Sequence, residues 1–182
     1  SSNPCGAPSN RPGRTCCWPA RPGAGTVPDG QARLGELTSG IYRHVEQARQ
    51  SITCATYNLQ ESSELWAALE RAARRPEIEV RLYLDGVAAH GSPLEVDAVA
   101  ARLPGAEVLA TPGGGASRRR VKSHAKFLVV DHRWSVVTSA NLSASAERFN
   151  VELGLLIDDR IVAEQIELQM RRLEGSIYHP IG

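Results

Sequence analysis

Short β-rich runs alternate with segments of helical periodicity from residue 31 onward, and this alternation limits the possible folds more than any other feature. Apolar residues recur at helical spacing over about 31–50, between Ser62 and Pro76, over about 93–103 and over 160–173. β-rich runs lie at 51–57, 78–84, 106–110, 127–130, 134–137 and 151–157. This order predicts an α/β domain in which a mixed β-sheet is flanked by helices on both faces.

The first 30 residues differ in composition from the rest of the chain. They are crowded with Pro, Gly, Ser and Arg and show neither period. Such a segment cannot bury enough apolar surface to offset its loss of conformational entropy, so we expect a flexible tail over 1–30 and one folded domain over 31–182. Cys5, Cys16 and Cys17 lie in this tail, and their spacing matches neither a zinc site nor a dense disulfide framework.

Charge and hydropathy exclude several classes of protein. The formal net charge is +1, which excludes a strongly basic protein that coats any polyanion. No apolar stretch reaches the length that crosses a bilayer, so we expect no stable membrane insertion. No secretion signal is visible, so we expect a reducing, cytoplasmic location.

The residues that carry chemistry begin with His124 and Lys126. They stand two positions apart, just before the apolar run 127–130, so on an extended backbone their side chains share one face. The ammonium group of a lysine supplies fixed positive charge for a phosphate. A histidine can act as a nucleophile or as a general acid and base near neutral pH. The pair therefore predicts a phosphate site at the start of a buried strand.

More polar residues follow at the ends of the next strands. Ser139 and Asn141 share a face and offer hydrogen-bonding groups to phosphate oxygens. Glu152 opens the strand after them, where a carboxylate can accept an imidazole N–H and fix the tautomer. Ordinary alternatives remain for single residues: Asn141 as a turn residue, and Glu152 as a solvent-facing strand residue. Asp131 can be a turn residue between the runs 127–130 and 134–137, which we expect to form a hairpin.

Five residue types stand at fixed offsets: His124, Lys126, Asp131, Asn141 and Glu152. Such a set arises by chance in about one chain in ten thousand. The H-x-K-x4-D pattern, followed by Ser139 and then the Asn, resembles the motif of the phospholipase D superfamily, the HKD group. The resemblance covers about 31–173 and implies the αβα sandwich of that superfamily. Thr138 stands where the family often has Gly.

The resemblance implies a two-step mechanism that needs two histidines. One histidine attacks phosphorus and forms a phosphohistidine, and the other protonates the leaving alcohol and then deprotonates water. Lys126 and Asn141 neutralise charge on the phosphoryl oxygens, and Glu152 is the carboxylate that pairs with the histidine. Asp131 completes the catalytic set in a structural or supporting role. Neither a metal nor a cofactor is implied.

The chain carries a single copy of the motif, because no other histidine is followed two residues later by a lysine. The second His–Lys pair must therefore come from another chain, and a twofold homodimer supplies it. We expect a homodimer with the active site across its axis.

A basic cluster precedes the motif, formed by Arg118, Arg119, Arg120 and Lys122. Beside a phosphate site such a cluster binds a polyanionic strand electrostatically, which favours DNA or RNA as the substrate. The alternative is that these residues form a solvated loop. Tyr57 and Asp85 each follow a predicted strand, and strand ends commonly hold the sites of α/β folds, so we expect both to line the cleft. The leading prediction is a metal-independent phosphodiesterase that acts as a nuclease.

Two other functions remain open. A phospholipase that acts on phospholipid head groups would use the same chemistry, although the sequence shows no amphipathic membrane helix. A nucleic-acid-binding subunit of a bacterial restriction or antiphage defence complex would carry a silent or conditional site. Such a subunit keeps its binding when His124 is replaced, whereas an enzyme loses its activity.

Overall fold

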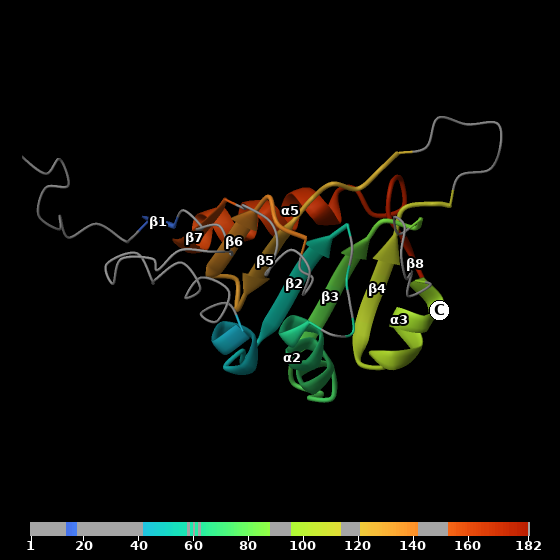
Figure 1. Ribbon diagram of the computed structural model, residues 1–182, viewed down its shortest axis with the longest axis horizontal. Coiled ribbons are helices and arrows are strands. Elements are labelled where there is room, and N and C mark those ends of the chain that lie inside the picture. The colour runs from blue at the N-terminus through green and yellow to red at the C-terminus, as the bar shows by residue number, and fades with distance from the viewer. Residues whose placement is uncertain are drawn as a thin grey trace, which may run out of the picture.

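A mixed β-sheet of 8 strands forms the centre of the structure, in the order β1-β7-β6-β5-β2-β3-β4-β8 (Figure 1). The computed structural model describes residues 14–17, 42–57, 59, 61, 63–87, 96–113, 121–141 and 153–181. The strands are β1 (Arg14–Cys17), β2 (Ser51–Thr56), β3 (Glu79–Leu84), β4 (Ala106–Ala110), β5 (Phe127–Val130), β6 (Trp134–Thr138), β7 (Gly154–Asp158) and β8 (His179–Pro180). The helices are α2 (Glu64–Ala73), α3 (Val96–Arg102) and α5 (Arg160–Arg171), and residues 42–46 are also helical. This arrangement confirms the predicted fold class.

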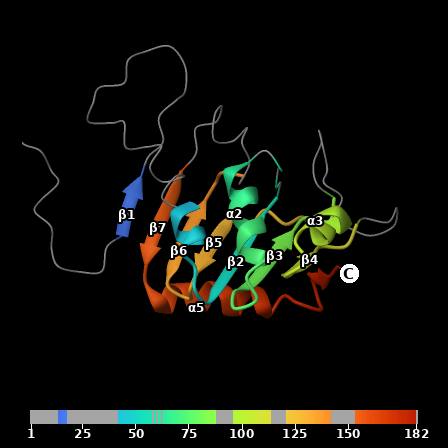
Figure 2. The ribbon, with the colours of Figure 1, turned by 90° about the horizontal axis from the view of Figure 1, so that it is seen from below.

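The directions of the strands bring several strand ends together. Strands β2, β3 and β4 run parallel, whereas β5, β6 and β7 extend the sheet with each strand antiparallel to its neighbour. The carboxyl ends of β2, β3, β4 and β6 therefore share one edge with the starts of β5 and β7. We call this the C-terminal edge. It is the upper edge of the sheet in Figure 1, and Figure 2 shows the same strands from below.

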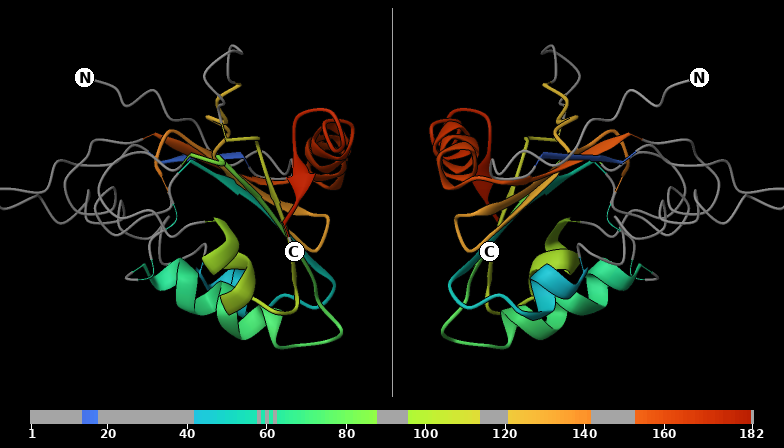
Figure 3. Two further views of the ribbon diagram at one scale, coloured as in Figure 1. Left: turned by 90° about the vertical axis from the view of Figure 1, so that its right-hand side faces the viewer. Right: turned by 90° about the vertical axis from the view of Figure 1, so that its left-hand side faces the viewer.

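Helices cover both faces of the sheet. Helix α5 lies on one face, and α2, α3 and the helical residues 42–46 lie on the other (Figure 3). The buried side chains of β2 alternate between two core clusters: Ile52 and Cys54 pack with α2, while Ala55 packs with residues of α5. Because both faces are covered, every residue of β2 and β5 is buried, including the polar Ser51, Thr53 and Thr56.

Helices α2 and α5 each begin at a capping side chain. The hydroxyl of Ser63 accepts a hydrogen bond from the backbone N–H of Trp66 at 3.1 Å. The carboxylate of Asp159 accepts from the backbone N–H groups of Ile161 and Val162. Within the described part of the chain, no helix has the length and apolar character needed to cross a membrane.

The predicted hairpin between β5 and β6 turns at Asp131 and His132. Both residues have a φ of 53°. The backbone N–H of Arg133 donates to the carbonyl of Val130 at 3.1 Å and closes the turn, and three residues separate the paired Val130 and Trp134. Aspartate and histidine adopt this left-handed region more readily than most residues, so the turn is encoded locally.

The structure departs from the predicted elements mainly at the borders of the sheet. Residues 14–17 fall within the expected flexible tail but form β1, which pairs antiparallel with β7. Strand β8, which pairs with β4, has no counterpart among the predicted strands. Strand β7 begins at Gly154 rather than at residue 151. Of the helix predicted over 31–50, residues 42–46 are helical and residues 47–50 are not, while residues 31–41 lie outside the described residues.

Candidate active site

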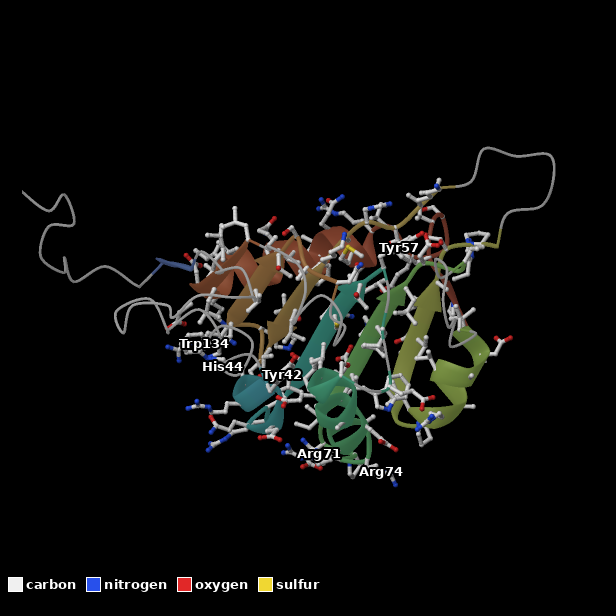
Figure 4. All side chains as sticks on the ribbon, in the orientation of Figure 1. Tyr42, His44, Tyr57, Arg71, Arg74 and Trp134 are labelled. Carbon is white, nitrogen blue, oxygen red and sulfur yellow. The ribbon has the colours of Figure 1, made fainter. Side chains whose placement is uncertain are left out.

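The side chain of His124 is exposed at the C-terminal edge, three residues before β5 begins. Its ring stacks on the ring of Tyr57, with the centroids 4.9 Å apart and an interplanar angle of 23°. Figure 4 shows Tyr57 at this edge, beyond the end of β2. The stack restricts the rotation of the imidazole, so Tyr57 orients the predicted nucleophile from the side.

The ammonium group of Lys126 lies next to the main chain of His124. Its Nζ donates to the carbonyl oxygen of His124 at 3.1 Å. The carbonyl oxygen of Lys126 in turn accepts from the backbone N–H of Thr138 in β6 at 3.1 Å. The imidazole and the positive charge therefore belong to one short segment that is fixed to the neighbouring strand, as a phosphate site requires.

Asp85 supports the segment that carries His124. Its carboxylate accepts from the backbone N–H of Ser123 at 2.8 Å and from that of Val87 at 3.1 Å. Asp85 is only 1% exposed, so its oxygens face protein donors rather than an open cleft. In the structure Asp85 supports the main chain before His124, and the substrate contact expected of it stays a prediction.

Ser139 and Asn141 follow β6 at the same edge. The Oγ of Ser139 accepts from the backbone N–H of Leu153 at 3.0 Å, and its own N–H donates to the Leu153 carbonyl at 2.9 Å. Ser139 thus extends the pairing of β6 with β7. The Oδ1 of Asn141 is buried and has no hydrogen-bond partner among the described residues.

Residues 41–174 match the family model described as cardiolipin synthase, PLD-like domain. The chain belongs to the phospholipase D superfamily. No curated protein sequence matches it.

Solved structures of the phospholipase D-like fold are similar to this chain. NucT from Helicobacter pylori is 18% identical with a TM-score of 0.67, and the match covers 88% of this chain and 94% of that chain. Nuc, a phospholipase D family member from Salmonella typhimurium, is 18% identical with a TM-score of 0.66, covering 93% and 98%. A phosphatidylserine synthase from Haemophilus influenzae is 14% identical with a TM-score of 0.60, covering 92% of this chain and 40% of that chain. At these identities the likeness shows the fold alone.

One residue departs from the phospholipase D pattern, because Thr138 stands where members often have Gly. The hydroxyl of Thr138 donates to the carbonyl of Leu153 at 3.2 Å and accepts from the backbone N–H of Ala140 at 3.0 Å. The larger side chain therefore forms two backbone hydrogen bonds at the end of β6, and it ties this strand to the start of β7.

Asp131, the aspartate of the HKD pattern, lies away from the site. It follows β5 whereas His124 precedes it, so the two residues lie at opposite edges of the sheet. The carboxylate of Asp131 accepts backbone N–H groups of Arg49, Gln50 and Ser51 at distances of 2.8 to 3.2 Å. Asp131 thus fixes the chain that enters β2 from within the hairpin turn, in agreement with the turn-residue alternative that the sequence leaves open.

Part of the predicted site lies outside the described residues. Glu152 and the arginines 118–120 are among these, so their roles stay predictions. Lys122 is described and exposed, two residues before His124. Among the described side chains, no three His, Cys, Asp or Glu residues form a group that could hold a metal ion.

Sequence reasoning missed two features of this edge. The first is a contact of Ser123 with Tyr178, which lie 55 residues apart and give no local pattern. The second is the need for glycine at position 86, where a Cβ would lie 1.8 Å from the carbonyl oxygen of Thr111. The Asp85-Gly86 dipeptide predicts a turn, but the close approach of β3 to β4 becomes evident only in the structure.

Proposed function

We propose that this chain is a phosphodiesterase that cleaves nucleic acid without a metal ion, through a phosphohistidine on His124, at a site completed by a second copy of the chain. One observation carries the proposal. The exposed imidazole of His124 is oriented by Tyr57 and is followed by Lys126, whose ammonium is fixed to the same segment. A nucleophile beside a fixed positive charge is suited to attack on a phosphodiester.

The reaction proceeds in two displacements at phosphorus. In the first, an imidazole nitrogen of His124 forms a bond to phosphorus while the bond to the leaving oxygen breaks, and His124 of the second copy protonates that oxygen. In the second, the histidine of the second copy removes a proton from water, whose oxygen displaces the imidazole from phosphorus. Lys126 stabilises the negative charge on the non-bridging oxygens in both steps.

The other described histidines do not supply the second imidazole. His44 stacks on Trp134 with centroids 4.5 Å apart, and Figure 4 shows both at the edge opposite Tyr57. His132 lies in the turn at that opposite edge, where its Nδ1 pairs with Glu167 at 2.7 Å. His179 belongs to β8, and three strands separate β8 from β5, a distance of roughly 19 Å. A second copy of His124 therefore remains the suitable source.

An apolar groove next to Lys126 supports self-association. It has a volume of about 520 Å³ and lies between the start of β5, Val137 of β6 and helix α5. Ile161 at the start of α5 is 72% exposed, and Val137 is 41% exposed. Large apolar side chains exposed together mark an interaction surface. A second copy seated there brings two Lys126 side chains toward one axis, which is the arrangement that the paired site needs.

A polyanionic strand is the favoured substrate. Lys122 is exposed beside the site, and the three arginines predicted to act with it precede it in the sequence. Contacts of this kind grip phosphates and carry no base specificity. A phospholipid is the second candidate, because the matching family is described as a cardiolipin synthase.

The test uses the full chain in EDTA with labelled single-stranded DNA, duplex DNA, RNA and vesicles of an acidic phospholipid. We expect cleavage of nucleic acid, and a loss of at least about a thousandfold in His124→Ala and Lys126→Ala. His179→Ala is the matched control, since His179 is exposed in β8, away from β5. Full rates in either site variant overturn the mechanism, while cleavage of vesicles alone assigns the lipid as the substrate. Binding without turnover in the wild type indicates a silent subunit.

A further inference from the structure

Ser123, the residue before His124, is held by buried groups from two sides. It is 4% exposed. Its backbone N–H donates to Oδ2 of Asp85 at 2.8 Å, and its hydroxyl lies 2.6 Å from the hydroxyl of Tyr178 in a second hydrogen bond. Both the main chain and the side chain of Ser123 are therefore fixed, although its neighbour His124 is exposed to solvent.

Tyr178 reaches this position from the far end of the chain. The segment after α5 folds back at Gly175, which has a φ of +74°, and the backbone N–H of Gly175 donates to the carbonyl of Tyr178 at 2.8 Å. The N–H of Tyr178 donates to the carbonyl of Leu173 at 3.1 Å. The next residues form β8 and pair with β4. Backbone hydrogen bonds therefore fix the position of Tyr178 independently of its contact with Ser123.

The ring of Tyr178 is fixed as firmly as its main chain. It is 4% exposed and packs edge-on against Tyr83, with the centroids 5.1 Å apart at 71°. The hydroxyl of Tyr83 donates to Glu174 at 2.5 Å, and Arg81 pairs with the same carboxylate at 2.7 Å. Burial raises the pKa of Tyr178, although the bond to Ser123 acts in the opposite direction, so its hydroxyl stays protonated at neutral pH.

We propose that Tyr178 is a positioning residue for His124, acting through Ser123. This inference rests on the proposed function, in which His124 is the nucleophile. Because the His124 side chain is exposed, its place is set by the stack on Tyr57 and by its main chain. Tyr178 holds that main chain one residue upstream. A displacement of a reacting group by about 1 Å can cost about a hundredfold in rate, so a single hydroxyl contact at this point has a measurable effect.

The test compares two tyrosine variants that lose the same atom. Tyr178→Phe removes the hydroxyl bound to Ser123 and keeps the ring packing, whereas Tyr83→Phe removes a hydroxyl of the same pair that does not touch Ser123. We expect Tyr178→Phe to lower kcat by about tenfold or more with KM within about twofold, and Tyr83→Phe to keep the wild-type kcat. A purely structural role predicts instead that both variants lose activity in proportion to their loss of Tm.

Ser123→Ala and the double variant complete the cycle. If one contact carries the effect, Ser123→Ala matches Tyr178→Phe, and the double variant is no slower than either single variant. Additive losses in the double variant, or a full kcat in Tyr178→Phe, overturn the inference.

A readout without catalysis separates this inference from the proposed function. We expect faster amide hydrogen exchange over residues 123–126 in Tyr178→Phe than in Tyr83→Phe. In Tyr178→Phe the exchange of β3 should equal that of the wild type. If the wild type cleaves no diester in EDTA, the proposed function fails and the exchange data decide the positioning alone. Equal exchange over 123–126 in the two variants overturns the positioning role.

Discussion

The imidazole of His124 lies on the ring of Tyr57, 4.9 Å between centroids, so a residue after β2 orients a residue before β5. Strands β2 and β5 are direct neighbours in the sheet, and Ala55 pairs with Phe127. The stack is therefore a consequence of the strand register: each ring lies just beyond the paired ends.

We expect Tyr57→Leu to lower kcat by about tenfold, because the imidazole loses the surface that restricts its rotation. Tyr57→Phe keeps a ring of the same shape and should lose less than Tyr57→Leu. Steady-state kinetics on a nucleic-acid substrate check both variants. A Tyr57→Phe enzyme as slow as Tyr57→Leu would show that the hydroxyl, and not the ring, is needed.

For Asp131 we predict an effect on stability and not on catalysis. Its carboxylate accepts three backbone N–H groups at the entry to β2, and its φ of 53° is strained for most side chains. We expect Asp131→Ala to lower the free energy of unfolding by about 1–3 kcal/mol. Asp131→Asn keeps one acceptor oxygen and tolerates positive φ, so it should lose less. Urea denaturation measures both. A large fall in kcat of folded Asp131→Ala at unchanged stability would restore a catalytic role.

The sequence predicts the strands that carry apolar runs but not the strands at the borders of the sheet. Runs such as 106–110 and 127–130 become β4 and β5 at the predicted bounds, because each places at least three consecutive apolar residues in the core. Strand β8 has only two residues and exists through its pairing with β4, so no local pattern reports it. The same holds for β1, which lies in a segment without strand periodicity.

In the candidate site, too, the sequence predicts the placement of residues that are close in the chain but not the contacts between residues that are far apart. The spacing of His124 and Lys126 is local, and their positions follow from the sequence. The position of Asp131 also follows, since seven residues of extended chain span about 23 Å and carry it to the other edge. The contact of Ser123 with Tyr178 joins residues 55 positions apart, and only the folded topology brings them together.

His44 makes the stability of the fold depend on pH. Partial burial lowers its pKa, although Asp158 opposes the shift. The unfolded chain therefore binds more protons than the folded chain when the pH falls below about 6.5, so stability is complete above that value and falls below it. We expect Tm to drop between about pH 8 and about pH 5.5, and to drop less in His44→Phe, which keeps a ring against Trp134.

Asp158→Asn is the control for this pH range. The hydrogen bond from Arg133 lowers the pKa of Asp158, so its contribution is lost only as the pH falls through a folded value below the ordinary one for aspartate. Because Asp158→Asn also removes the charge that opposes the shift of the His44 pKa, the slope of Tm between about pH 8 and about pH 5.5 should persist or steepen in this variant. An equal slope in His44→Phe and the wild type would assign the effect to another group.

The surface around Ile161 tests whether two chains form the site. Ile161 is 72% exposed on α5 and lines the groove that ends at Lys126. A carboxylate there opposes burial against a second copy, so we expect Ile161→Asp to shift the protein from dimer to monomer in sedimentation velocity. Activity should fall with the dimer fraction, and wild-type specific activity should fall on dilution. Arg74→Glu, which changes an exposed charge at the C-cap of α2, should leave both properties unchanged. A monomeric Ile161→Asp variant with full diesterase activity would place the whole reaction within one chain.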